Sequence, residues 1–258
     1  MKMNVFNLTA SRTLFIAIAT AATLSACQKE NIKSPVAQAQ ASTEENSDAS
    51  VFMSTEGSDS KLVLRPGPGN GQDVYVEDRS GVSSGNMNYV PELPINSWTG
   101  GGTYITTRSF IKFTDLSLIP STATVVSAKL FLYGISQSLN SPQGNSYYPG
   151  SPYNGYGDNQ CLVQKVVGAN WDESTLTYGT QPSTTTTDQG ILSPSTSQWN
   201  YNATVDVTRM VQSMVASPST NYGFAIKLAT EQLYRSIVFA SSEEASRSLR
   251  PRLLVVYR

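Results

Sequence analysis

Histidine is absent from the 258-residue chain. Its absence excludes Ser-His-Asp and Cys-His nucleophilic catalysis, proton transfer through an imidazole, and every metal site that depends on histidine ligands. Cysteine is nearly absent, with only Cys27 and Cys161. Because Cys27 carries a different signal, described below, we expect no disulfide and interpret Cys161 as a small buried apolar side chain.

Charge is also scarce, at 14% of residues, and neither sign dominates: 18 basic residues stand against 19 acidic ones. Lys2 and Arg12 lie in a leader segment, and removing these two leaves 16 basic residues against 19 acidic ones, a net charge of −3. A chain without a basic excess has little with which to neutralise phosphates. We therefore expect no nucleic-acid partner.

The acidic residues form no recognisable catalytic pair. A glycosidase needs two carboxyl groups in one cleft. The adjacent pairs Asp172-Glu173 and Glu243-Glu244 do not supply them directly, because neighbours on a strand point to opposite faces. Tyrosine with arginine or lysine can serve a polysaccharide lyase, but no spacing here marks such a set. The sequence thus predicts no catalytic residues and a protein that is not an enzyme.

Metal ligands are similarly sparse. Asp73, Glu77, Asp78 and Asp158 lie in or beside expected loops, where carboxylates can bind Ca²⁺. No stretch of the chain has the ligand spacing of an EF-hand loop. We predict no cofactor and no metal site, with a structural calcium ion as the alternative left open.

The first 26 residues have the features of an export signal. Lys2 and Arg12 supply positive charge, and the apolar segment from Leu14 to Leu24 is too short to span a bilayer. Residues 1–26 are therefore predicted to be a signal peptide.

The end of this leader, Leu24-Ser-Ala-Cys27, is similar to the lipobox of bacterial lipoproteins. That similarity implies cleavage before Cys27 and attachment of a diacylglycerol to its thiol, which would anchor the protein in a membrane. The expected location is the outer membrane, with the domain in the periplasm or on the cell surface. Ordinary secretory cleavage after Ala26 is the alternative.

Residues 27–59 lack apolar periodicity and are dominated by Ser, Ala, Gln, Glu and Asp. Such a segment buries too little to offset the entropy of ordering it. We predict that it is a flexible tether from the lipidated Cys27 to a domain at residues 60–258.

Within residues 60–258, apolar residues alternate with polar ones in many short segments, the pattern of half-buried strands. Long loops are expected at 78–103 and 136–160. After Asp206, a possible N-cap, apolar residues recur with helical spacing from Val207 to Val215. Strands are expected around residues 62–64, 73–77, 108–113, 128–133, 161–167, 171–178, 203–207, 224–228, 237–239 and 253–257. This pattern predicts one antiparallel, jelly-roll-like β-sandwich, an all-β fold with one short helix.

Six blocks in this region carry a family resemblance. They are the segment Arg108-Ser-Phe-Ile-Lys-Phe to Tyr133, Trp171-Asp-Glu-Ser-Thr-Leu-Thr-Tyr178 with Gln181-Pro182, Asp206-Val-Thr208, Asn221-Tyr-Gly-Phe224, Phe239-Ala-Ser-Ser-Glu243 and Arg250-Pro-Arg-Leu-Leu-Val-Val-Tyr257. Together they resemble a DNRLRE domain, a jelly-roll-like sandwich related to carbohydrate-binding modules. The resemblance implies the same fold and a carbohydrate ligand. Tyr178, where the family often has a second Trp, and the long 136–160 segment depart from its pattern.

Aromatic residues in the two long loops are the candidate ligand-binding groups. A Tyr or Trp ring can cover the apolar face of a sugar, and neighbouring hydroxyl and amide groups can fix its orientation. We interpret Trp171 and Trp199 as core residues. The alternative for the loops is a self-packed lid over one end of the sandwich. The predicted carbohydrate-binding residues are Trp98, Tyr147, Tyr148, Tyr153 and Tyr156.

The function expected from the sequence is therefore that of a non-catalytic lipoprotein that binds a polysaccharide and contacts the membrane through its lipid. A structural or adhesive module of the envelope is the first alternative. A polysaccharide lyase or glycosidase is the second, disfavoured by the absence of histidine and of a convergent acid pair.

Overall fold

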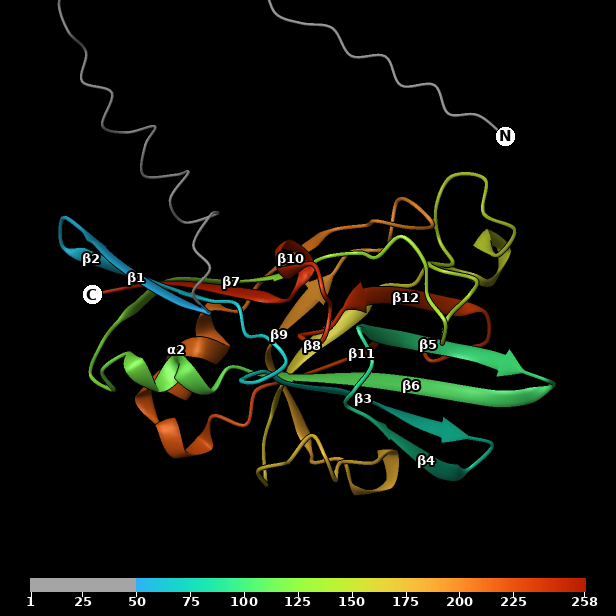
Figure 1. Cartoon of the computed structure of the whole chain (residues 1–258), viewed down its shortest axis with the longest axis horizontal. Coiled ribbons are helices and arrows are strands. Elements are labelled where there is room, and N and C mark those ends of the chain that lie inside the picture. The colour runs from blue at the N-terminus through green and yellow to red at the C-terminus, as the bar shows by residue number, and fades with distance from the viewer. Residues whose placement is uncertain (1–49) are drawn as a thin grey trace, which may run out of the picture.

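The computed structural model describes residues 50–258, apart from the side chains of residues 83–85. The predicted signal peptide, the lipidation site Cys27 and the tether up to residue 49 lie outside these residues. Figure 1 shows two layers of strands, with a short helix beside them. Over residues 50–258, no helix combines the length and apolar character needed to cross a membrane.

One layer is a five-stranded antiparallel sheet with the order β1-β2-β13-β7-β10. Its strands are β1 (Val51–Glu56), β2 (Asp59–Leu64), β7 (Val125–Leu132), β10 (Ala203–Asp206) and β13 (Arg252–Tyr257). On β7, Ala128, Leu130 and Leu132 are buried while Lys129 is exposed. This alternation places every second side chain in the core.

The second sheet has eight strands, in the order β12-β5-β6-β11-β8-β9, with β3 paired to β6 and β4 paired to β3. Its strands are β3 (Gln72–Arg79), β4 (Val82–Met87), β5 (Glu92–Gly100), β6 (Thr103–Lys112), β8 (Cys161–Val166), β9 (Thr184–Leu192), β11 (Phe224–Leu228) and β12 (Arg235–Ala240). All of its pairings are antiparallel as well. The predicted all-β sandwich is confirmed.

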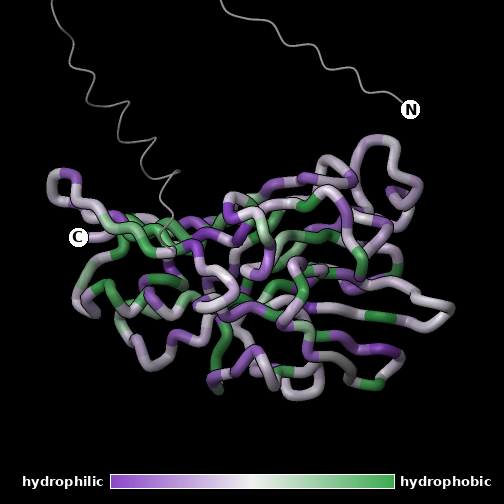
Figure 2. Tube along the Cα trace, in the orientation of Figure 1, coloured by the Kyte–Doolittle hydropathy of each residue, from purple (hydrophilic) through white to green (hydrophobic). Residues whose placement is uncertain are grey.

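The main core lies between the two sheets. Leu130 and Val255 from the five-stranded sheet belong to the same buried cluster as Ile111, Val163 and Phe239 from the eight-stranded sheet. Figure 2 shows hydrophobic residues concentrated along the strands and hydrophilic residues along many of the outer connections. Burial of this apolar surface is the main favourable contribution to folding.

Helix α2 (Thr208–Ala216) also packs on the core through Met210, Val211, Met214 and Val215, as the helical spacing predicts. The N-cap is Val207 rather than Asp206. The Asp206 carboxylate still accepts a hydrogen bond of 2.9 Å from the Thr208 N–H, so it caps the helix from one residue earlier. Short 3₁₀ helices occur at η1 (Thr114–Leu118), η2 (Asn154–Tyr156), η3 (Tyr178–Thr180), η4 (Pro218–Thr220) and η5 (Arg247–Leu249).

Strand β1 corrects the expected extent of the tether. Residues 51–56 pair with β2 in the five-stranded sheet, so the folded domain begins before residue 60. The Ser50 carbonyl also accepts a hydrogen bond of 2.8 Å from the Arg65 N–H. Backbone pairing with β2 orders this segment even though none of its side chains is fully buried.

The expected loop at 78–103 is instead largely strand. β5 and β6 form a hairpin whose last pair is Gly100 with Thr103. Gly101 and Gly102 between them have φ values of 57° and 81°, the left-handed conformation that a two-residue hairpin turn requires and glycine adopts readily. Trp98 therefore stands on a strand and not in a flexible loop.

One further expectation is wrong, and one strand was not expected. The segment 171–178 is not a strand but a series of turns ending at η3, and residues 184–192, absent from the expected strands, form β9. β9 lies at the edge of the eight-stranded sheet, where threonine suits a pleated backbone and needs no buried partner. Cys161 is fully buried, as expected, and burial raises the pKa of its thiol.

Candidate functional site

A cluster of four aromatic rings joins β5 to two loops. The Trp98 ring centroid lies 4.7 Å from that of Tyr153 and 5.2 Å from that of Tyr234, both edge-on. Tyr156 contacts Tyr234 at 4.7 Å. We call Trp98, Tyr153, Tyr156 and Tyr234 the aromatic cluster. Edge-to-face contacts of this kind stabilise ring positions, so the indole of Trp98 is held in place.

Tyr234 adopts an unusual backbone conformation to join this cluster. Its φ is +67°, in the left-handed region that a bulky residue rarely adopts. The Tyr234 N–H donates a hydrogen bond of 2.8 Å to the Ser97 carbonyl, which fixes the turn against β5. Backbone strain of this kind is concentrated at sites where a side chain must be held in one position.

The loop of residues 136–160, here called the tyrosine loop, is fastened to β12 by buried polar side chains. The Asn145 carboxamide accepts from the Val238 N–H and donates to the Ser197 carbonyl, both at 2.9 Å. The Asn159 carboxamide donates to the Ser236 carbonyl at 2.6 Å. Because these bonds saturate the free edge of β12, the loop is part of the fold and its tyrosines are pre-positioned.

A cleft of about 300 Å³ opens beside the aromatic cluster. Alternate residues of three strands and one side of the tyrosine loop line it. They include Tyr75, Glu77 and Arg79 of β3, Pro94, Asn96 and Trp98 of β5, Ile105 and Thr107 of β6, and Asn140 and Gln143 of the loop. Its size and its mixture of aromatic and amide groups suit a small ligand or part of a chain.

Asn96, which lines this cleft, has an unused acceptor. Its side chain is only 3% exposed, and its Nδ2 donates to the Ser141 hydroxyl at 2.9 Å. Its Oδ1 is buried with no hydrogen-bond partner among the described residues. A buried carbonyl oxygen without a partner is costly, so a ligand hydroxyl that donated to it would regain that energy.

The charged groups in the cleft are paired. Arg79 Nε lies 2.9 Å from Glu77 Oε1 in a salt bridge along β3. Tyr75, which also lines the cleft, is 1% exposed, and burial followed by the nearby Glu77 carboxylate raises the pKa of its phenol. Tyr75 is therefore neutral at physiological pH and serves as a hydrogen-bonding or apolar wall, not as a base.

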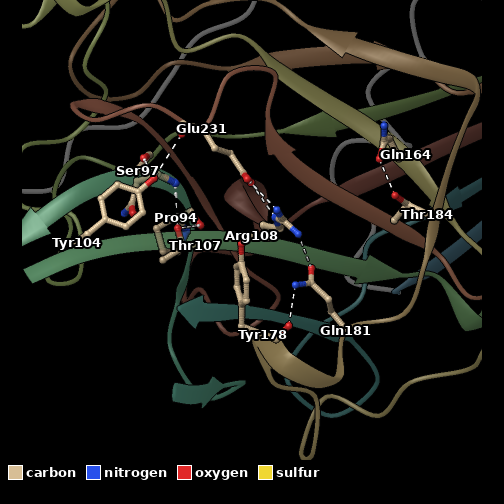
Figure 3. Close-up of polar contacts among 11 residues, drawn as sticks. Pro94, Ser97, Tyr104, Thr107, Arg108, Gln164, Tyr178, Gln181, Thr184 and Glu231 are labelled. Carbon is tan, nitrogen blue, oxygen red and sulfur yellow. Dashed lines mark hydrogen bonds and ion pairs between the residues drawn. The ribbon is translucent and has the colours of Figure 1, made fainter. Parts of the chain in front are cut away.

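Arg108, the first residue of the family-like blocks, lies in a separate polar network on β6 (Figure 3). Its guanidinium donates two hydrogen bonds of 2.7 Å to the Glu231 carboxylate and one of 3.0 Å to the Gln181 side-chain oxygen. It also lies 4.9 Å from the ring centroid of Tyr178. The bonds to Glu231 are the main cause of a raised pKa for Arg108. This arginine links three segments and has no free donor fork for a ligand.

The structure brings together some of the predicted binding residues and separates others. Trp98, Tyr153 and Tyr156 meet in the aromatic cluster, and Trp98 also lines the cleft. Tyr147 and Tyr148 make no ring contact with this cluster in the described part of the chain. The Tyr147 carbonyl accepts from the Ser195 hydroxyl at 2.6 Å, so its backbone fastens the loop. Whether any of these residues binds carbohydrate remains a prediction.

Asn96 and Tyr234 are absent from the set expected from the sequence. Pro94, Asn96 and Trp98 alternate along β5, as do Tyr75, Glu77 and Arg79 along β3. The Gly101-Gly102 turn would have revealed β5 as a strand and so placed Asn96 beside Trp98 on one face. Tyr234 lies between β11 and β12, and no local signal marks its ring contacts.

Among the acidic residues considered as metal ligands or catalysts, Asp73, Glu173 and Glu243 lie near one another, while Glu77 and Asp158 make separate contacts. Glu77 pairs with Arg79, and the Asp158 carboxylate accepts from the Gln160 N–H at 3.1 Å. Asp73 is buried and accepts from the Ser242 N–H at 2.8 Å. Over the described residues, no group of three or more Cys, Asp or Glu side chains is arranged to hold a metal ion.

Comparison with curated proteins yields no match for the chain. Comparison with family models yields one, that of carbohydrate-binding module family 96, over residues 70–257. The matched residues include nearly the whole sandwich, the aromatic cluster and the cleft. This agrees with the relation to carbohydrate-binding modules that the six sequence blocks imply, while the narrower DNRLRE assignment stays a prediction. The chain belongs to carbohydrate-binding module family 96.

Proposed function

We propose that this protein is a non-catalytic lipoprotein that binds a polysaccharide in the cleft beside Trp98. One observation carries the proposal: Trp98 lines the cleft while Tyr153 and Tyr234 hold its ring edge-on. An immobilised indole loses little entropy when a ligand stacks on it. Membership of a carbohydrate-binding family supports a sugar as that ligand.

The cleft offers complementary groups for one or two sugar units. The indole of Trp98 can cover the apolar C–H face of a ring. Asn96 Oδ1 can accept a hydrogen bond from a sugar hydroxyl, and Gln143 and Thr107 add polar atoms along the same wall. Stacking then supplies affinity and the amides supply orientation.

The remaining parts of the proposal come from the sequence. Absence of histidine, the neutral Tyr75 and the paired Glu77 in the cleft support binding without catalysis. The lipobox ending at Cys27 supports an outer-membrane anchor, with the sandwich presented in the periplasm or on the cell surface. Binding of a polysaccharide at a membrane would retain it there for other proteins to process.

Exchange of Trp98 for Ala tests the binding site. We expect Trp98→Ala to weaken glycan affinity at least tenfold, about 1.4 kcal/mol, because a buried aromatic contact of this kind typically contributes that much. The measurement is calorimetric titration of the detergent-solubilised full chain with the best ligand from a glycan array. Tyr147→Ala, in the tyrosine loop but outside the aromatic cluster, is the control and should bind normally.

The opposite pattern identifies the alternative. If Trp98→Ala lowers the melting temperature while glycan affinity is unchanged, the aromatic cluster is a lid that stabilises one end of the sandwich. If no glycan on the array binds, a structural or adhesive envelope module becomes the better description. Release of reducing sugars by the wild-type chain would contradict the non-catalytic part.

A further inference from the structure

Two arginines stand side by side on the outer face of the five-stranded sheet, away from the cleft. β2 and β13 pair Leu64 with Leu253, so Arg65 and Arg252 occupy the next positions opposite each other. In Figure 1 this sheet runs along the upper edge of the molecule, while β3, β5 and β6 extend to the right. Arg65 is only 7% exposed. Like charges in cross-strand contact destabilise a sheet, so this pairing needs a compensating group.

Aromatic rings support both guanidinium groups. Arg252 Cζ lies 4.1 Å from the ring centroid of Phe131, and Arg65 Cζ lies 5.9 Å from that of Tyr133. Both rings come from the neighbouring strand β7 or the residue just after it. A guanidinium stacked on a ring keeps its N–H edges available for an in-plane partner. The rings therefore orient the two arginines, and the Tyr133 hydroxyl also acts on Arg65 as a hydrogen-bond partner.

No carboxylate among the described residues neutralises this pair. The ion pairs that the structure shows there join Lys61 to Glu56, Arg79 to Glu77, Arg108 to Glu231 and Arg209 to Asp188. Arg252 Nε is buried and donates to no described acceptor. Leaving a buried donor of a charged group unsatisfied is costly.

The electrostatic surroundings agree with this geometry. Burial lowers the pKa of Arg65, Tyr133 opposes that shift, and the nearby Arg252 and Arg247 lower the pKa further. The positive charges of Arg65, Arg252 and Arg247 are thus close together. Arginine forks match the paired oxygens of carboxylate, sulfate and phosphate groups, each of which would relieve this repulsion.

We propose that Arg65 and Arg252 form an oxyanion site on the outer face of the five-stranded sheet, separate from the cleft beside Trp98. Its ligand is a group with two coplanar oxygens, either a carboxylate or sulfate substituent on a polysaccharide or a free inorganic anion. The site does not depend on the proposed function of the cleft, since it uses different strands and different residues.

Thermal unfolding of the full chain tests the site. At constant ionic strength, replacing part of the chloride by a few millimolar sulfate or phosphate should raise the wild-type melting temperature by about 2–4 °C. Arg252→Met keeps contact with Phe131 but removes the charge, so the melting temperature should no longer respond to the anion. Arg209→Met, which removes an arginine on α2 that is 84% exposed, should leave the response intact.

Thermal unfolding also shows whether the Arg252→Met variant is folded. Without added anion, Arg252→Met should melt at or above the wild-type temperature, because the repulsion with Arg65 is gone. An equal anion response in wild type and Arg252→Met, or no response in either, would overturn the proposal.

A second arm distinguishes the two sources of the oxyanion. The full chain is titrated with a sulfated or uronate oligosaccharide and with a neutral oligosaccharide of equal length. Affinity for the charged chain that falls in Arg252→Met but survives in Trp98→Ala assigns the site to a polysaccharide substituent. A response to inorganic anion with no such preference assigns it to a free ion. Loss of affinity in Trp98→Ala alone supports the cleft and not this site.

Discussion

Two connecting segments pack against the eight-stranded sheet, and both carry aromatic residues, yet they are attached differently. The tyrosine loop, residues 136–160, is held by buried Asn and Ser side chains and leaves Tyr153 and Tyr156 partly exposed. Residues 167–183, here called the apolar cover, bury Trp171 and Leu176 to 5% and 4% exposure.

The apolar cover packs as a small second core. Trp171 and Leu176 join Phe110 and Val76 in one buried cluster, and the Trp171 ring lies 5.8 Å from that of Phe110. The Trp171 indole N–H donates to the Tyr222 carbonyl at 2.7 Å, so the polar atom of this side chain is satisfied internally. Little of the Trp171 side chain is therefore left to meet a ligand.

The comparison shows that aromatic content alone does not distinguish a binding loop from a structural one. Where apolar side chains attach a segment to the sheet, the aromatic rings of that segment are buried in the core. Where amides and hydroxyls fasten it, the rings remain on the surface in fixed positions, which is the arrangement that binding requires. Three variants would sharpen or break this contrast.

The largest expected effect is that of Trp171→Ala. Removing a buried tryptophan leaves a cavity beside Phe110, so the free energy of unfolding should fall by about 3–5 kcal/mol. Urea denaturation measures the loss, and glycan affinity of the folded fraction should be unchanged. A comparable loss of stability in Trp98→Ala would remove the distinction between the two segments.

An intermediate effect is expected for Asn145→Ala in the tyrosine loop. The Val238 N–H and the Ser197 carbonyl would both lose a buried partner, costing about 1–3 kcal/mol of unfolding free energy. Glycan affinity should fall severalfold in the same variant, because the rings are no longer pre-positioned. Asn154→Ala, an exposed residue whose side chain bonds within the loop to Tyr148, is the control and should change both quantities less. Unchanged affinity in Asn145→Ala would show that the fastening does not serve binding.

The smallest expected effect concerns pH. The apolar cover meets β3 where the Asp73 N–H donates to the Glu173 carboxylate at 3.1 Å. Burial, and then the neighbouring Glu243 carboxylate, raise the pKa of both Asp73 and Glu173. Groups whose carboxyl pKa is higher in the folded than in the unfolded state favour folding only while protonated. Stability should therefore decline as pH rises from the ordinary value near 3.8 toward the raised values.

The measurement is the melting temperature across that pH range. Asp73→Asn keeps an acceptor for the Ser242 N–H and should make the decline of stability with pH less steep. Asp172→Asn, which changes the exposed carboxylate next to Glu173, should not have this effect. The opposite result would be a wild-type stability that rises with pH over the same range, with the rise lost in Asp73→Asn. That result would contradict the raised carboxyl pKa of Asp73 as the cause.

Much of the fold could be predicted because interior strands carry a strong pattern. β7 and β13 alternate buried and outward residues, and α2 repeats Met and Val with helical spacing. β1, β4, β5 and β9 were not predicted; β1, β4 and β9 are edge strands, whereas β5 is an interior strand inside the segment expected as a loop. An edge strand needs only one neighbour and can be polar, so its side chains carry little information about pairing.

The candidate site was predictable only in part for a related reason. Tyr153 and Tyr156 are conspicuous in a loop rich in Gly and Pro, and Trp98 is one of three tryptophans. Their meeting with Tyr234, more than seventy residues further along the chain, depends on a turn with positive φ and on pairing between β5 and β12. Local patterns do not encode such contacts.

By itself, the sequence determined the fold class, the burial of Trp171 and Cys161 and the absence of histidine chemistry, since each follows from local periodicity or composition. Only the tertiary structure decided which tyrosines surround Trp98, that Asn96 has an unpartnered oxygen at the cleft, and that Arg65 stands opposite Arg252. The physical reason is that ring contacts, unsatisfied acceptors and cross-strand charge pairs depend on register and on loop closure between distant segments.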